Sequence, residues 1–295
     1  MAGLRARSAL FTLFGDVIRP AGGTAWLTTI TACMQALDFT PEATRTALHR
    51  MAAEGWVAPS KVGRFSAYRL TDRGVERLDE AAARIYRLRA ADWDGHWHVL
   101  VCPAAGRDSA VSSALRWMGH GRLSADVWIS PHRQGERVAR LLDAHGLTGS
   151  SVRLDSAATS DPAENARIVD VAWDLSELRT AHQAFIDQWG DLTPPPEPQT
   201  AFVTRIRLVH HWRSFLFLDP GLPSRLLPAD WLGDAAADIF RRLYAAVDDA
   251  AWTFYDELSA AAPPLDATRA NGVLSGRSPG ETAITARLDA LQTSR

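Results

Sequence analysis

The sequence contains only two cysteines, Cys33 and Cys102, in 295 residues. Two cysteines cannot supply the dense disulfide framework that holds small secreted domains together. Both lie in apolar stretches of different segments, so we expect reduced core residues in a cytoplasmic protein.

Long apolar runs are missing as well, since none approaches the roughly twenty residues that a helix needs to cross a bilayer. Arg5 and Arg7 precede the stretch SALFTLFGDVI, but that stretch is amphipathic and contains Asp16, unlike the apolar core of a signal peptide. We therefore expect neither a membrane span nor a leader peptide.

The most informative stretch that is present lies between Thr40 and Gly74. Thr40 is a suitable N-cap, and Pro41 follows at the first helical position, where its missing N–H costs nothing. Gly55 marks the end of this helix. At helical spacing, four polar residues share the face opposite the apolar residues Ala47, Leu48 and Met51. They are Arg45, Thr46, His49 and Arg50.

A hairpin and another capped helix follow. Trp56-Val57 and Ser66–Leu70 have strand composition, and the turn between them carries Lys61, Gly63 and Arg64. Thr71 is placed to cap the next helix. The helix alone is better explained as a capped surface helix with solvated arginines, but helix, basic hairpin and capped helix together favour DNA binding.

Two further helices are expected upstream of this stretch. Ser8–Ile18 has an amphipathic pattern, and Thr24 is expected to cap a second helix that buries Trp26, Leu27 and Ile30. Three helices and a basic hairpin make a winged helix-turn-helix.

Charge is distributed unevenly along the chain. Residues 1–89 contain thirteen Arg or Lys against eight Asp or Glu, a net charge of +5, whereas the whole chain has −2. Residues 90–295 therefore carry −7. A basic segment on an acidic body suits contact with a phosphate backbone.

The middle of the chain alternates strands and helices with short loops, which predicts a small α+β domain of ferredoxin-like type. Its first strand contains His96 and His98, a spacing that can chelate a metal ion, with Trp97 facing the core. The alternative is two polar residues on the exposed side of an edge strand. Because no Cys-x-x-Cys or His-Glu-x-x-His pattern accompanies them in residues 90–172, we expect no metal site.

The last third is expected to be helical, with helices over Ser176–Trp189, Ala201–Phe217 and Ala235–Leu258. Arginines recognise phosphates and carboxylates, and a tryptophan stacks on flat rings. The candidates for a small-molecule site are therefore Arg205, His211, Trp212 and Arg213. The alternative is that Trp212 packs in the core and the arginines are solvated.

Five blocks of the chain, in order, resemble the PaaX family of bacterial transcriptional repressors. They are ARSALFTLFGDVIRPAGGTAW, ATRTALHRMAAEGW, WDGHWHVLVCP, LRWMGHGRLSADVWISPH and WRSFLFLDPGLPSRLLPADW, and the likeness runs from about Arg7 to about Leu258. The resemblance implies an N-terminal winged helix, a central Cas2-like ferredoxin domain and a helical C-terminal domain. It also implies a homodimer on double-stranded DNA with a partly palindromic operator, and release by an aryl-CoA thioester, typically phenylacetyl-CoA, or another acyl-CoA.

The resemblance gives Arg45, Thr46, His49 and Arg50 the recognition-helix positions and Lys61 and Arg64 the wing positions. His49 stands where we expect a small polar residue in relatives, so its operator is expected to differ. The likeness to Cas2 does not imply nuclease activity. The first central strand has no acidic residue at its end, where Cas2 nucleases place a metal-binding aspartate.

The expected organisation is therefore a winged helix in 1–89, a ferredoxin-like domain in 90–172, a helical domain in 173–263 and a flexible tail in 264–295. We expect no enzyme activity and no cofactor other than the effector. Two alternatives stay open. One is a metal-dependent nuclease or CoA-thioester enzyme that uses the central domain, and the other is a DNA-binding adaptor without a ligand.

Overall fold

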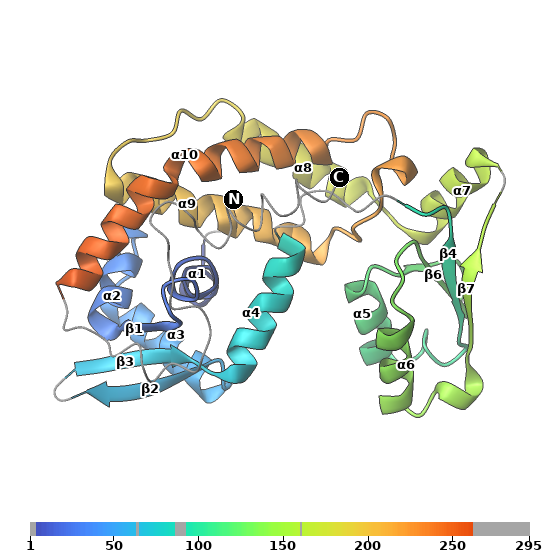
Figure 1. The fold of residues 1–295 in the computed structure, drawn as a ribbon, viewed down its shortest axis with the longest axis horizontal. Coiled ribbons are helices and arrows are strands. Elements are labelled where there is room, and N and C mark those ends of the chain that lie inside the picture. The colour runs from blue at the N-terminus through green and yellow to red at the C-terminus, as the bar shows by residue number, and fades with distance from the viewer. Residues whose placement is uncertain (1–3, 63–64, 86–92, 160, 262–295) are drawn as a thin grey trace. The chain divides into compact units, whose positions relative to one another are not determined.

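The computed structural model describes residues 4–62, 65–85, 93–159 and 161–261 (Figure 1). By their contacts these residues form two compact units. Of the described residues, the first unit contains 4–62, 65–85, 187–214 and 237–261, and the second contains 93–159, 161–186 and 215–236. The segment expected as one helical domain, 173–263, thus contributes to both units, and the expected tail 264–295 lies outside the described residues.

The N-terminal part of the first unit is a winged helix. Its helices and helical turns are α1 (Ala6–Leu13), the π-helical turn η1 (Phe14–Ile18), α2 (Leu27–Ala36), α3 (Pro41–Ala53) and α4 (Asp72–Ile85). Its strands are β1 (Thr24–Trp26), β2 (Val57–Val62) and β3 (Phe65–Leu70). Figure 1 shows β2 and β3 as a hairpin close to α3.

The prediction that Thr24 caps a helix is wrong. Residues Thr24–Trp26 form strand β1, and the helix α2 begins only at Leu27. The cause is a long-range pairing, because β1 runs antiparallel to β3 with Thr24 opposite Arg69 and Trp26 opposite Ala67. The sheet of this unit therefore has the order β1-β3-β2.

The C-terminal helices α9 (Pro198–Trp212) and α10 (Gly233–Ala260) complete the core of the winged helix. α1 contacts α3 and α9. Leu10 and Phe14 are fully buried in one cluster with Phe202, Ile206 and Trp252. The expected helix over Ala201–Phe217 ends earlier, at Trp212, and continues as the 3-10 turn η3 (Arg213–Phe217).

The second unit contains a four-stranded antiparallel sheet with the order β5-β6-β4-β7. In chain order it runs β4 (Trp97–Val101), α5 (Ser109–Trp117), β5 (Gly121–Arg122), β6 (Val127–Ser130), α6 (Gly135–Ala144) and β7 (Val152–Ala157). This βαββαβ order is that of the ferredoxin-like fold, so the α+β class is confirmed.

The two faces of this sheet pack against different partners, because neighbouring residues of a strand point to opposite sides. Leu100 and Trp128 face a core with α5 and α6. Trp97 and Ile129 face the opposite core, with α7 (Pro162–Ala172). The remaining elements of the described residues are the short turns η2 (Thr148–Ser150) and η4 (Ser224–Leu226) and the helix α8 (Ser176–Trp189).

The expectation that both cysteines are unpaired core residues is confirmed, since Cys33 and Cys102 are free and buried. Burial raises the pKa of the Cys33 thiol to about 12, which keeps it protonated. None of the helices in the described residues is long and apolar enough to span a membrane.

Candidate DNA-binding surface and ligand cavities

Helix α3 begins and ends as its sequence predicts. The hydroxyl of Thr40 accepts a hydrogen bond of 3.2 Å from the backbone N–H of Ala43, and Pro41 follows at the first position. Glu42 lies at the positive end of the helix dipole. Gly55, with φ of 74°, takes the left-handed conformation that ends the helix region.

The inner face of α3 is fixed in the core. Thr44, Leu48 and Met51 are fully buried, and Ala47 is nearly so. The four residues predicted to contact DNA are all exposed on the outer face, namely Arg45, Thr46, His49 and Arg50. The structure therefore brings them together on one surface.

This surface has little internal charge compensation. Arg45 lies 3.9 Å from Glu42, but the two side chains are 61% and 78% exposed, and such surface pairs contribute little. Among the described residues, the side chains of His49 and Arg50 have no hydrogen-bond or ion-pair partner. The guanidinium of Arg50 is thus available to a base edge or a phosphate.

The wing is a regular two-stranded ribbon. Lys61, at the end of β2, is exposed and lies opposite Ser66 of β3. Gly63 and Arg64 lie outside the described residues. Of the two predicted wing cations, Lys61 is therefore the one whose position the structure gives.

The start of α4 lies close to the backbone of Gly55 and Trp56, which lead into the wing. The hydroxyl of Thr71 accepts from the N–H of Gly74 at 3.0 Å and donates to the carbonyl oxygen of Gly55 at 2.6 Å. This confirms Thr71 as the cap of α4. A Cβ on Gly74 would lie 2.3 Å from the carbonyl oxygen of Trp56, so only glycine fits there.

Arg205, a predicted ligand contact, lies inside the first unit with 1% of its side chain exposed. Its Nε donates to Asp16 of η1 at 2.7 Å, and its other nitrogens donate to Asp248 and to the hydroxyl of Tyr244. That hydroxyl donates in turn to Asp16 at 3.0 Å. We call these four residues the buried ion cluster. Arg205 has a structural role there, and no exposed surface is left for a ligand.

Electrostatics in the buried ion cluster favour the charged arginine. Burial by itself would lower the pKa of Arg205, but the carboxylate of Asp16, with further help from Asp248, raises it above its ordinary value. Burial also raises the pKa of Asp248, against the opposing effect of Arg205. The guanidinium lies over the rings of Tyr244 and Trp252, 4.5 and 5.2 Å from their centroids.

The other three predicted ligand contacts are also engaged with the protein. Trp212 is 8% exposed and stacks on Phe240 with centroids 4.8 Å apart. His211 lies 2.9 Å from the indole Nε1 of Trp189, and Arg213 donates to the carbonyl oxygen of Ser8 and the hydroxyl of Thr12. That these residues bind a ligand stays a prediction.

One interpretation of the sequence placed His96 and His98 on an edge strand, and this interpretation is wrong. β4 is an interior strand between β6 and β7. The expected inward orientation of Trp97 is confirmed, since it is 1% exposed. His98 shares the opposite face with Leu100, and its side chain is only 12% exposed.

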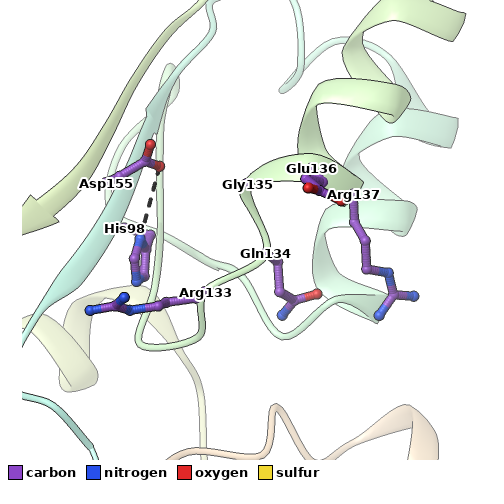
Figure 2. Close-up of a pocket in the computed structure, with 7 residues that line it drawn as sticks. All are labelled: His98, Arg133, Gln134, Gly135, Glu136, Arg137 and Asp155. Carbon is purple, nitrogen blue, oxygen red and sulfur yellow. Dashed lines mark ion pairs between the residues drawn. The ribbon is translucent and has the colours of Figure 1, made fainter.

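His98 borders a polar cavity of about 610 Å³ beside the first turn of α6 (Figure 2). Its Nδ1 lies 3.9 Å from Asp155, while Arg133 donates two hydrogen bonds to Asp94. Burial lowers the pKa of His98. Within the described residues no group of three or more His, Cys, Asp or Glu side chains is arranged to hold a metal ion.

Another cavity, of about 770 Å³, lies in the second unit between α7, the start of α8 and the segment from Arg225 to Trp231. It has two tryptophans in its lining, Trp173 and Trp231. The sequence reasoning did not single out this cavity. The lining residues from α7 and α8 lie more than forty residues before the segment from Arg225 to Trp231. The helix α7 itself was not predicted, although Asp161-Pro162 is a helix start signal.

Comparison with known proteins identifies the chain. Three family models match consecutive parts: "PaaX-like protein" over residues 5–74, "PaaX protein central Cas2-like domain" over 90–169 and "PaaX-like protein C-terminal domain" over 173–257. The chain is also 32% identical over 262 residues to the transcriptional repressor PaaX of Escherichia coli strain K12, covering 85% of this chain and 83% of the relative.

The chain belongs to the PaaX family. The resemblance drawn from the five sequence blocks is thereby confirmed. The matched central domain coincides with the βαββαβ sheet, and the family's N-terminal region coincides with the winged helix that carries α3.

A solved structure shows a similar fold. It is that of the uncharacterized protein Rv0674 from Mycobacterium tuberculosis, which has a TM-score of 0.56 and 27% identity to this chain. The match covers 86% of this chain and 99% of that one. The similarity of fold thus extends over most of this chain and almost all of that protein.

Proposed function

We propose that this protein is a DNA-binding transcriptional repressor of a catabolic operon, released from its operator by an acyl-CoA. Kinship with the repressor PaaX supports repression and DNA binding. The observation that carries the proposal is the outer face of α3, where Arg45, Thr46, His49 and Arg50 are exposed while the inner face is buried.

In this proposal α3 lies in the major groove. Arg50 and His49 read base edges, and Lys61 contacts the flanking phosphate backbone. A homodimer would place two copies of α3 on the half-sites of a partly palindromic operator, about one helical turn apart or a multiple of it.

The proposed effector is chosen from the family resemblance, which implies an aryl-CoA such as phenylacetyl-CoA. Thermodynamics requires the ligand to bind better to a conformation with low operator affinity than to the DNA-bound one. The proposed response is therefore a fall in operator affinity as ligand concentration rises.

The test is an electrophoretic mobility-shift titration with a duplex that the wild-type protein selects from a random pool. Arg50→Ala should weaken binding about 5- to 150-fold, the cost of one lost base contact of ~1–3 kcal/mol. Arg140→Ala is the matched control, because Arg140 is an exposed arginine of α6 in the other unit. Equal affinity of both variants, with unchanged circular dichroism, would remove α3 as the DNA-reading helix.

Lys61→Ala separates phosphate contact from base reading. It should weaken binding to selected and unrelated duplexes alike and reduce the slope of log affinity against log salt by about one. An unchanged slope would show that the wing cation does not touch the backbone.

A further inference from the structure

The cavity beside α7 has the size and lining of a small-molecule site. Its volume of about 770 Å³ lies within the usual range of roughly 300–1,000 Å³ for ligand pockets. Val169 and Leu226 form buried apolar walls, and Trp173 and Trp231 contribute aromatic surface. Val171, which also lines it, is 63% exposed.

Trp173, one of the lining residues, carries a hydrogen-bond donor without an acceptor. The indole Nε1 of Trp173 is buried and has no partner among the described residues. An indole N–H can only donate, and leaving a buried donor unsatisfied is costly. A ligand with a carbonyl oxygen in the cavity would supply the missing acceptor.

The cations at the cavity differ in their availability. Arg179 donates two hydrogen bonds of 3.0 Å to Asp230 and lies 5.7 Å from the ring centroid of Trp231, so its charge is already paired. Arg225 is exposed and has no ion-pair partner within the part of the chain that the structure describes. It is therefore the cation best placed to meet a phosphate.

The carboxylates restrict where an anionic group can lie. Asp174 lines the cavity, but its Oδ1 accepts from the backbone N–H and the hydroxyl of Ser176 at the start of α8. Asp170 lines the cavity as well. Because two carboxylates oppose a polyanion inside, the phosphates of a ligand belong at the exposed Arg225 and its apolar end belongs between the tryptophans.

We propose that this cavity is the effector site and that it takes the acyl end of an aromatic acyl-CoA. The aromatic ring packs against Trp231 and Trp173, the thioester carbonyl oxygen accepts from Nε1 of Trp173, and Arg225 contacts a phosphate of the CoA. This assignment rests on the proposed function, and it places the effector in the second unit, away from the residues first predicted from the sequence.

The experiment is isothermal titration calorimetry of the full chain with phenylacetyl-CoA, free CoA and free phenylacetate. Phenylacetyl-CoA should bind at least about tenfold more tightly than either fragment, because only the whole molecule fills the cavity and meets Arg225. Equal binding of free CoA would overturn the placement of the acyl end.

Three variants test the site. Trp173→Phe keeps an aromatic ring but removes the donor, and Arg225→Gln removes the cation, so each should weaken binding about tenfold. Ala166→Phe, at an exposed position that lines the cavity, narrows it and should weaken binding. Arg167→Gln is the matched control, since Arg167 is an exposed arginine of the same helix that does not line the cavity.

The outcomes separate the two proposals. If wild-type protein binds phenylacetyl-CoA and all three variants bind it equally well, this cavity is not the effector site, while the acyl-CoA effector stands. If the wild-type protein binds none of the three compounds, both the proposed effector and this site fail. Weakened binding in the three variants, with Arg167→Gln and operator binding unchanged, supports the assignment.

Discussion

Replacing Arg205 by methionine is the sharpest test of the buried ion cluster. Arg205 and Asp16 are each 1% exposed, so the substitution would leave the Asp16 carboxylate in the core without its counter-ion. Breaking a buried ion pair in this way costs about 3–5 kcal/mol, far more than an exposed pair is worth.

Two contacts in the buried ion cluster reduce the expected loss of stability. Asp16 would keep its hydrogen bond from Tyr244, and Asp248 is 15% exposed, so its carboxylate can gain water. We therefore expect Arg205→Met to lower the free energy of unfolding by about 3 kcal/mol, the low end of the range for broken buried pairs. Replacing Asp16, Arg205 and Asp248 together by leucine, methionine and leucine should recover most of the loss, because no uncompensated charge remains.

The assay is urea unfolding followed by tryptophan fluorescence and far-UV circular dichroism. Arg207→Met is the control, since Arg207 lies two residues along α9 and forms an exposed pair with Asp38. A loss below about 1 kcal/mol for Arg205→Met would refute the structural role. If that variant also lost acyl-CoA binding while staying fully stable, Arg205 would be a ligand contact after all.

Three further predictions concern local features. Burial, with a smaller effect from His132, lowers the pKa of His120 to about 4, so His120 favours folding above pH 6.5 and this contribution is lost as the pH falls toward 4. The free energy of unfolding of the wild-type protein should thus fall from pH 7 to pH 5 by about 2 kcal/mol more than that of His120→Gln, and parallel curves would contradict the buried neutral state. Gly74→Ala should destabilise the protein by about 1–3 kcal/mol, because its Cβ would meet the Trp56 carbonyl oxygen. Gly149→Ala, with open space around it, should leave the melting temperature nearly unchanged. If the two variants lowered the melting temperature by similar amounts, the close approach of Gly74 to the Trp56 carbonyl oxygen would be refuted.

The sequence predicted best those features whose causes are local. Thr40, Pro41 and Gly55 bound α3 by contacts within a few residues, and the exposed face of α3 follows from its helical period. The outward positions of Arg45 and Arg50 could therefore be predicted without any knowledge of the rest of the fold.

Features caused by distant partners could not be predicted in the same way. Strand β1 exists because Thr24–Trp26 pairs with β3, more than forty residues later. Arg205 suggests a solvated or ligand-binding arginine until Asp16, 189 residues away, is placed against it. One signal was present, since Arg205 falls on the apolar side of its helix, between Phe202 and Val209, where a charged residue requires a buried partner.

The core of the first unit also argues against treating residues 1–89 as a separable DNA-binding domain. Leu10 and Phe14 are buried in a cluster that includes Phe202 and Trp252 from the C-terminal helices. Each such side chain returned to water costs about 1.5–3 kcal/mol, and a whole domain is stable by only about 5–15 kcal/mol. α1 contacts both α3 and α9, so the recognition helix and the C-terminal helices share a packing partner. The C-terminal helices are therefore part of the structure that holds α3 in place.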